Sequence, residues 1–175
     1  ATCCILIIDP TQAILRSAYI GDCGYMILRK EVREEKSHSE IIKKSDKGID
    51  SSSSDEEGSK KIILREVFIS EEQTKKFNFP YQVGVNGDDP ETSLSYTHEL
   101  KINDIIIAGS DGLFDNLTTK EIKDLVRPYL IASDKVYSTD LLAEILSQKA
   151  FENSRNPLYN SPYAQRAKNE KIDYK

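Results

Sequence analysis

The chain has 175 residues, of which 38% are hydrophobic and 30% are charged, and its formal net charge is −5. This length suits one domain with a core of its own. The acidic balance argues against nucleic acid as a partner, because proteins that bind phosphate backbones carry a basic surface. No apolar run approaches the roughly 20 residues that span a bilayer, so no membrane span is expected.

The cysteines and the N-terminal residues bear on the compartment. Three cysteines, two of them adjacent at Cys3 and Cys4, are too few for a secreted disulfide framework, so an intracellular, reducing compartment is expected. Residues 1–8 form an apolar, strand-like run with neither a basic flank nor a cleavage-site pattern. This pattern is not that of a targeting peptide, and it is typical of a chain entered in mid-domain.

Three strands are predicted at the beginning of the chain, over residues 2–8, 13–20 and 25–29. Each is rich in β-branched and apolar residues, and turn-forming clusters at 9–12 and 21–24 separate them. Such short connections predict an antiparallel meander.

Residues 31–61 differ in composition from everything around them. They hold only four large aliphatic residues among many Ser, Lys, Glu and Asp residues. Such a segment buries too little apolar surface to offset the entropy of ordering it, so a disordered insertion is predicted. Serines 51–54, followed by acidic residues 55–57, also suit an acid-directed kinase, although a solvated loop is the plainer interpretation.

Strands return over 62–69, 94–100 and 104–108. Between the first two, residues 70–73 have the spacing of a helix N-cap with a reciprocal glutamine, which predicts a short helix over 70–77.

The last third of the chain has the pattern of helices. Thr118 and Glu121 form a capping box, residues 138–150 have an apolar helical face, and Ser161 followed by Pro162 is a further helix start. Strands followed by helices that pack against them predict an α+β layered arrangement.

The densest candidate for chemistry is the segment 109–116. Asp111 comes directly after an apolar strand, and Gly109 and Gly112 allow the backbone to turn tightly there. If a helical turn begins here, Asp111 and Asp115 are neighbours that repel each other unless a cation or proton lies between them. Their oxygen donors suit Mg²⁺ or Mn²⁺ better than Zn²⁺. A plain turn followed by a helix-start acid remains the alternative.

Asp22 and Cys23 lie in the predicted turn 21–24, where aspartate is common for turn formation alone. Cys23 and Arg29 have the spacing of cysteine-dependent phosphatases. That chemistry needs a phosphate-cradling loop, whereas residues 24–28 favour a strand that would hold the two side chains roughly 20 Å apart. The match is therefore interpreted as an accident of spacing.

The two histidines, His38 and His98, have no Cys or carboxylate at ligand spacing and are expected to be solvated. No Ser-His-Asp set, glycine-rich nucleotide loop or CxxC pair is present.

Several segments together resemble the type 2C protein phosphatases. Residues 18–25 (AYIGDCGY) resemble the family's "aNxGDSr" segment, with Cys where Ser is usual, and residues 110–116 (SDGLFDN) are similar to its "(S/T)DGLfDn" segment. Residues 73–82 and 154–164 resemble stretches of a eukaryotic branch that includes mitochondrial and chloroplast members.

The resemblance implies a four-layer α-β-β-α fold, in which helices flank a β-sandwich of two antiparallel sheets. It implies a Ser/Thr protein phosphatase in which water activated by Mg²⁺ or Mn²⁺ attacks phosphoserine or phosphothreonine. Asp111 would be a ligand of the central metals, and Asp22 and Asp115 would join it in holding a further, weaker ion. Phosphoprotein substrates and a monomer follow from the same resemblance, and a mitochondrial location is compatible with it.

Two family motifs are missing from the chain, "DGHGG" upstream and "GGKxDDIT" downstream, and both supply metal ligands. The resemblance therefore implies that residues 1–175 are part of a single catalytic domain, incomplete at both ends and inactive alone. A catalytically dead member of the fold that acts as a binding or scaffold protein is the competing hypothesis. The flanking coding sequence would decide between them.

Overall fold

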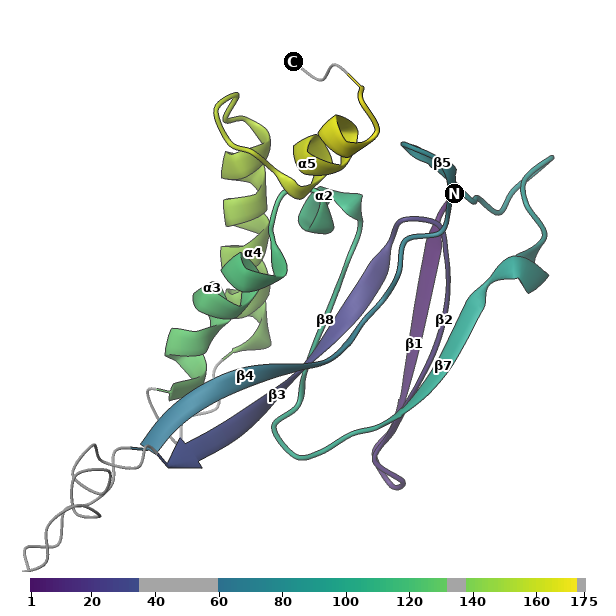
Figure 1. Cartoon of the computed structure of the whole chain (residues 1–175). Helices are drawn as coiled ribbons and strands as arrows, with labels where there is room; N and C mark the ends of the chain where they lie inside the picture. Colours follow the sequence, from purple (N-terminus) through teal and green to yellow (C-terminus); the bar gives the residue numbers. More distant parts are fainter. Residues whose placement is uncertain (35–59, 132–137, 173–175) are drawn as a thin grey trace, which may run out of the picture.

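The computed structural model describes residues 1–34, 60–131 and 138–172. The strands are β1 (Cys3–Asp9), β2 (Ile14–Ile20), β3 (Gly24–Glu34), β4 (Lys60–Ile69), β5 (Thr74–Lys76), β6 (Phe79–Pro80), β7 (Leu94–Glu99) and β8 (Ile105–Gly109). The helices are the 3-10 turn η1 (Pro90–Thr92), α2 (Asp111–Phe114), α3 (Thr119–Ile131), α4 (Thr139–Ser154) and α5 (Pro162–Asn169). Strands come first and helices last (Figure 1), which confirms the predicted α+β class.

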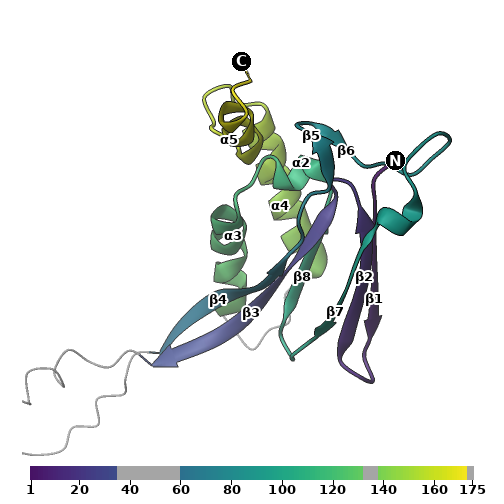
Figure 2. The same cartoon turned by 45° about the vertical axis from the view of Figure 1, so that its right-hand side comes forward.

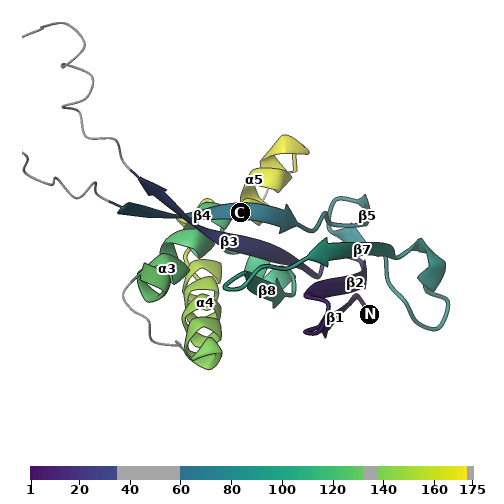
Figure 3. The ribbon, with the colours of Figure 1, turned by 90° about the horizontal axis from the view of Figure 1, so that it is seen from below.

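Two three-stranded antiparallel sheets form a sandwich, one in the order β1-β2-β7 and the other in the order β4-β3-β8. A small β5-β6 hairpin is the third sheet. The views in Figures 2 and 3 show the layers in sequence, with α3 and α4 on the outer face of β4-β3-β8 and with β1-β2-β7 on its other side. The described residues thus show three of the four layers that the resemblance implies.

The two sheets bury an aromatic and aliphatic core between them. Strand β3 contributes Tyr25 and Ile27 to it, and β2 contributes Leu15 and Tyr19, all at most 1% exposed. On both strands these positions alternate with residues of the opposite face, as the two-residue period of a strand requires. The core fixes the register of both sheets, since a shift by one residue would expose it.

A second core lies between β4-β3-β8 and the helices. The other face of β3 supplies Met26 and Leu28, and α3 and α4 cover them with aliphatic residues that include Ile122 and Leu146. Helix α3 begins at the predicted capping box, in which the Glu121 carboxylate accepts a hydrogen bond from the backbone N–H of Thr118 (2.8 Å).

The helix predicted over 70–77 is wrong, because those residues lead into the β5-β6 hairpin. The Ser70 hydroxyl accepts a hydrogen bond from the backbone N–H of Tyr25 (2.8 Å), and the Gln73 side chain donates to the carbonyl of Thr92 (2.9 Å). Both capping groups are therefore engaged by distant segments. A local capping signal has no effect when tertiary partners take its atoms.

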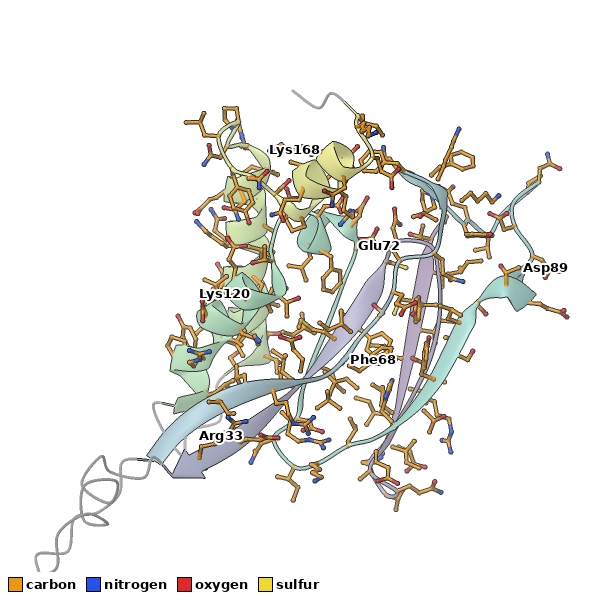
Figure 4. The ribbon with its side chains drawn as sticks, viewed as in Figure 1. Arg33, Phe68, Glu72, Asp89, Lys120 and Lys168 are labelled. Carbon is orange, nitrogen blue, oxygen red and sulfur yellow. The ribbon has the colours of Figure 1, made fainter. Side chains whose placement is uncertain are left out.

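The predicted insertion over residues 31–61 is too wide at both ends. Residues 31–34 belong to β3 and residues 60–61 to β4, and the two strands pair as far as Glu34 opposite Lys60. The labelled Arg33 marks this end of the hairpin in Figure 4. Residues 35–59, with the predicted kinase site, lie outside the described residues.

His98 also departs from expectation, because it faces the core and not the solvent. Its Nε2 is 2.7 Å from the hydroxyl of Tyr25, and its ring lies 4.4 Å from that of Phe68. The polar and aromatic alternation of β7 places Tyr96 and His98 on the same inward face.

None of the described helices is both long and apolar enough to cross a membrane.

Candidate active site

Strand register brings two of the predicted site residues to the same end of the sandwich. In the antiparallel β3-β8 pair, Gly24 lies opposite Gly109. Asp22 precedes Gly24 by two residues and Asp111 follows Gly109 by two, so both extend beyond the paired region at one edge. The sequence segments are far apart, and the ladder alone makes them neighbours.

The short helix α2 adds Asp115 to this edge. The Ser110 hydroxyl accepts a hydrogen bond from the N–H of Gly112 (3.2 Å), which starts the helical turn, and the N–H of Asp115 donates to the carbonyl of Asp111 (2.7 Å). The two aspartates therefore lie one turn apart, as their spacing predicts. Asp111 also accepts a hydrogen bond at Oδ1 from Gly112 N–H (2.7 Å).

Gly21 fixes the turn that carries Asp22. Its φ is +95°, a region that side chains rarely adopt. A Cβ at this position would also lie only 2.7 Å from the carbonyl oxygen of Tyr81 and closer still to Thr2. A glycine is therefore required for the β2-β3 turn to pass between the N-terminal residues and the hairpin.

Arg166 of α5 and Glu72 complete the site. The Arg166 guanidinium forms an ion pair through NH2 with Asp115 Oδ1 and another through NH1 with Glu72 Oε1 (3.1 Å). Helix α5 is attached to α2 at its start, where the N–H of Tyr163 donates to the carbonyl of Asp115 (3.2 Å). Figure 4 shows Glu72 at the end of the molecule where α2 and α5 lie.

Burial and neighbouring charges change the ionisation of two of these acids. Burial raises the pKa of Asp115, and the negative charges of Asp111 and Asp22 raise it further. The adjacent Arg166 guanidinium opposes this rise without cancelling it. The pKa of Glu72 is also raised, first by burial and then by the same three aspartates, against the effect of Arg166. The four carboxylates therefore interact with one another, and their mutual repulsion favours binding of a cation.

A polar cavity of about 370 Å³ opens beside these acids. Its walls come from the β5-β6 hairpin, with Lys76 and Phe77, and from one face of α5, with Tyr163 and Arg166, while Asp22, Glu72 and Asp115 line its inner side. A larger cavity of about 770 Å³ lies between β8 and α4, but no acidic, basic, His or Cys side chain lines it. Of these two cavities, the smaller one therefore has the groups suited to chemistry, and a third of about 280 Å³ adjoins it at Asp22 and Glu72.

Comparisons with known proteins find similar phosphatases. No family model matches the chain. Over 153 residues it is 28% identical to a rice protein named as a protein phosphatase 2C, an alignment that covers 86% of this chain and 37% of the rice protein. It is 25% identical over 174 residues to the human protein phosphatase PTC7 homolog, covering 94% of this chain and 46% of the human one. Over most of its length the chain is similar to type 2C protein phosphatases.

A solved structure shows the shared fold. The photosystem II phosphatase PBCP superposes with a TM-score of 0.70 at 23% identity, covering 99% of this chain and 53% of that one. This likeness confirms the type 2C sandwich that the sequence motifs implied. The chain spans less than half the length of the rice and human relatives.

The acids of the candidate site offer oxygen donors that suit a divalent cation, but their side chains do not surround one common point. Within residues 1–34, 60–131 and 138–172, no three His, Cys, Asp or Glu side chains come close enough together to hold an ion. Two contacts occupy oxygens of these acids: Asp115 pairs with Arg166, and Oδ1 of Asp111 accepts the N–H of Gly112. Carboxylate oxygens are donors that fit Mg²⁺ or Mn²⁺, so the type of donor suits such an ion.

Cys23, where the type 2C pattern has serine, is not arranged as a nucleophile. Its thiol lies 3.6 Å from the carbonyl of Ile20, and burial raises its pKa, so the reactive thiolate is disfavoured. Arg29 lies farther along β3, bound to Asp104. The structure therefore agrees that the cysteine and arginine spacing is accidental.

Sequence reasoning missed Glu72 and Arg166. Glu72 lay in the segment predicted to be helical, and Arg166 was one basic residue among many. The one local signal was the helix start at Ser161, which places Tyr163 and Arg166 on one face of α5 at a spacing of three residues. The acidic partners of Arg166 come from other elements, so no local pattern could have indicated the ion pairs.

Proposed function

We propose that the protein is a metal-dependent phosphatase that hydrolyses phosphoserine and phosphothreonine in proteins. The observation that carries this proposal is the placement of Asp22, Asp111 and Asp115 at the same end of the sandwich, close enough for their charges to influence one another. Repelling carboxylates beside a cavity are an arrangement that a divalent cation stabilises. The names of the relatives support phosphatase chemistry.

In this proposal Asp111 binds the central metals, and Asp22 and Asp115 join it in holding a further, weaker ion, with Mg²⁺ or Mn²⁺ as the metal. A bound ion of this kind supplies a water of lowered pKa as the nucleophile and offsets the charge of the phosphoryl group. The protein's part is to hold the carboxylates in place. The Ser110 cap and the β3-β8 register position Asp111, and Gly21 positions Asp22.

The polar cavity is the proposed place of the phosphorylated side chain. Its volume of about 370 Å³ accommodates a phosphoserine or phosphothreonine with part of the peptide around it. Lys76 lines the wall formed by the hairpin and offers a positive charge to the phosphate. The substrate class and a monomeric state are proposals from the family resemblance, with which a mitochondrial location is compatible, and an intracellular location is proposed from the cysteine content.

The test is turnover of phosphoserine and phosphothreonine peptides by the intact protein, measured against Mn²⁺ concentration. Asp111→Asn is expected to reduce turnover by more than about 100-fold, above the range for residues that only support ligands. Asp22→Asn and Asp115→Asn should mainly raise the Mn²⁺ requirement. Cys23→Ser is the matched control and should leave turnover nearly unchanged. Residues 1–175 alone, with three loosely arranged ligands, should show no turnover.

A catalytically inactive scaffold is the second candidate, and one observation favours it: Arg166 compensates the charge of Asp115 without a metal. The same measurements separate the two. Metal-dependent hydrolysis that disappears in Asp111→Asn excludes the scaffold. Full hydrolysis in excess EDTA, or normal activity of Asp111→Asn, would contradict the proposed metal mechanism.

A further inference from the structure

Arg166 is the one cation that the described structure pairs with acids of the candidate site. Its NH2 group pairs with Oδ1 of Asp115 and its NH1 group with Oε1 of Glu72 at 3.1 Å. The Asp115 side chain is 19% exposed and that of Glu72 33% exposed. The guanidinium thus joins Asp115, a proposed metal ligand, to Glu72, which is not a proposed ligand.

The backbone of α5 holds this guanidinium in place. The Ser161 hydroxyl caps the helix by accepting the N–H of Ala164 (3.1 Å), and Ala164 and Ala167 are buried against the rest of the protein. The N–H of Tyr163 is bound to the carbonyl of Asp115. Arg166 therefore reaches Asp115 from a helix that is itself attached to the residue it binds, so the ion pair is built into the fold.

We propose that Arg166 is an internal counter-ion that competes with the divalent cation for Asp115. This inference rests on the proposed function, since it takes Asp115 as a metal ligand. The guanidinium and the metal are attracted to the same carboxylate, and two cations repel each other, so metal binding weakens or displaces the contact of NH2 with Oδ1. Glu72 retains the displaced guanidinium through NH1, which keeps the exchange local. Arg166 thereby lowers the affinity for the metal and raises the metal concentration at which the site fills.

The experiment is direct Mn²⁺ binding to the intact protein without substrate, followed by the electron paramagnetic resonance signal of the free ion. Arg166→Gln should bind Mn²⁺ about 10-fold more tightly, the equivalent of one lost hydrogen bond between charged groups. The matched control is Lys168→Gln, which removes the same charge from the same helix. Lys168 contacts Asn160 (2.7 Å) and none of the four acids, so its affinity change should stay within about twofold. Figure 4 labels Lys168 on α5.

A double-mutant cycle tests whether Arg166 acts through Asp115. In an Asp115→Asn background, Arg166→Gln should change Mn²⁺ affinity by less than about twofold, because the contested carboxylate charge is gone. An equal gain in both backgrounds would overturn the inference and assign the effect to the general field of the guanidinium.

Folding of the variants is checked by thermal melting in EDTA. If Arg166→Gln does not fold, Arg166→Lys is the deciding variant. Lysine keeps the charge but cannot bridge two carboxylates as the planar guanidinium does. The Arg166→Lys protein should therefore bind Mn²⁺ more tightly than wild type. Unchanged or weaker Mn²⁺ binding in the folded variants overturns the inference and leaves the metal site standing. Absence of Mn²⁺ binding in wild type and all variants would overturn the proposed metal site as well.

Discussion

The two sheets of the sandwich contain similarly apolar strands, but the described residues cover only one of them on both faces. In β3, Tyr25, Met26, Ile27 and Leu28 are all fully buried, because one face meets the opposite sheet and the other meets α3 and α4. In β1, the outward-facing Ile5 and Ile7 are 53% and 59% exposed. Hydrophobicity alone therefore does not determine burial, and the position of the helices does.

The two interfaces also differ in chemistry. The core between the sheet and the helices consists of aliphatic residues and Met26. Between the sheets, polar groups are included: the hydroxyl of Tyr25 lies 2.6 Å from that of Ser17, and Arg29 reaches both Asp104 and the carbonyl of Glu99. We infer that the helix side is held mainly by apolar packing, whereas polar contacts also orient one sheet on the other.

The largest expected effect is the loss of a buried aliphatic side chain on the helix side. Ile122→Ala should lower the free energy of unfolding of the 175-residue chain by about 3 kcal/mol, because a cavity remains where Ile122 was 1% exposed. Ile7→Ala on the uncovered face should change it by less than about 0.5 kcal/mol. Urea unfolding followed by circular dichroism measures both. Equal losses would show that the outer face of β1 is buried in solution.

A smaller effect is expected from the ion pair between Arg29 and Asp104, whose side chains are 13% and 2% exposed. Asp104→Asn should destabilise the chain by about 2 kcal/mol, since Arg29 is left buried without its counter-charge. Asp124→Asn, in the exposed pair with Lys120, is the matched control and should lie within the error of the same urea measurement.

Asp104→Asn should also change how the free energy of unfolding depends on pH in the acid range. Burial alone would raise the pKa of Asp104, but hydrogen bonds from Arg29 and from the N–H of Lys101 outweigh it and hold the pKa below 3.8. Its contribution is present above that ordinary value and is lost as the pH falls through the lower pKa of the folded state. Asp104→Asn should therefore lose less stability on acidification, and an identical dependence on pH would contradict the assigned role of this pair.

The smallest effect is expected from His98 between the sheets. Burial lowers its pKa below the ordinary 6.5. The unfolded chain therefore takes up a proton first as the pH falls below about 6.5, and stability declines until the folded-state pKa is passed. His98→Gln should remove this decline, by at most about 1 kcal/mol. Thermal melting across this pH range measures it, and a wild-type midpoint that rises on acidification would refute the buried position.

The fold class and part of the site could be predicted from the sequence because their signals are local. The apolar and β-branched content of β2 and β3, the capping box at Thr118 and the helix start at Ser161 each involve residues close in the chain. The spacing of Asp111 and Asp115 is of the same kind, because one helical turn makes them neighbours. These elements and spacings depend on the local backbone geometry, which a few residues adjacent in the chain determine without distant contacts.

Only the tertiary structure decided features in which distant segments compete for the same atoms. The capping signal at Ser70 and Gln73 failed because Tyr25 and Thr92 take their polar groups. His98 turned inward because its strand places it opposite β3, and Asp22 joined Asp111 through the β3-β8 register.

The contact of Arg166 with Asp115 and Glu72 belongs to this second group. It arises where α5, α2 and the segment before the hairpin meet. A residue's sequence neighbours set its backbone conformation, whereas the partner of a charge or hydroxyl depends on which elements pack together. The sequence by itself therefore determined most of the elements and the candidate acids, and packing decided the remaining hairpin and how those acids are paired.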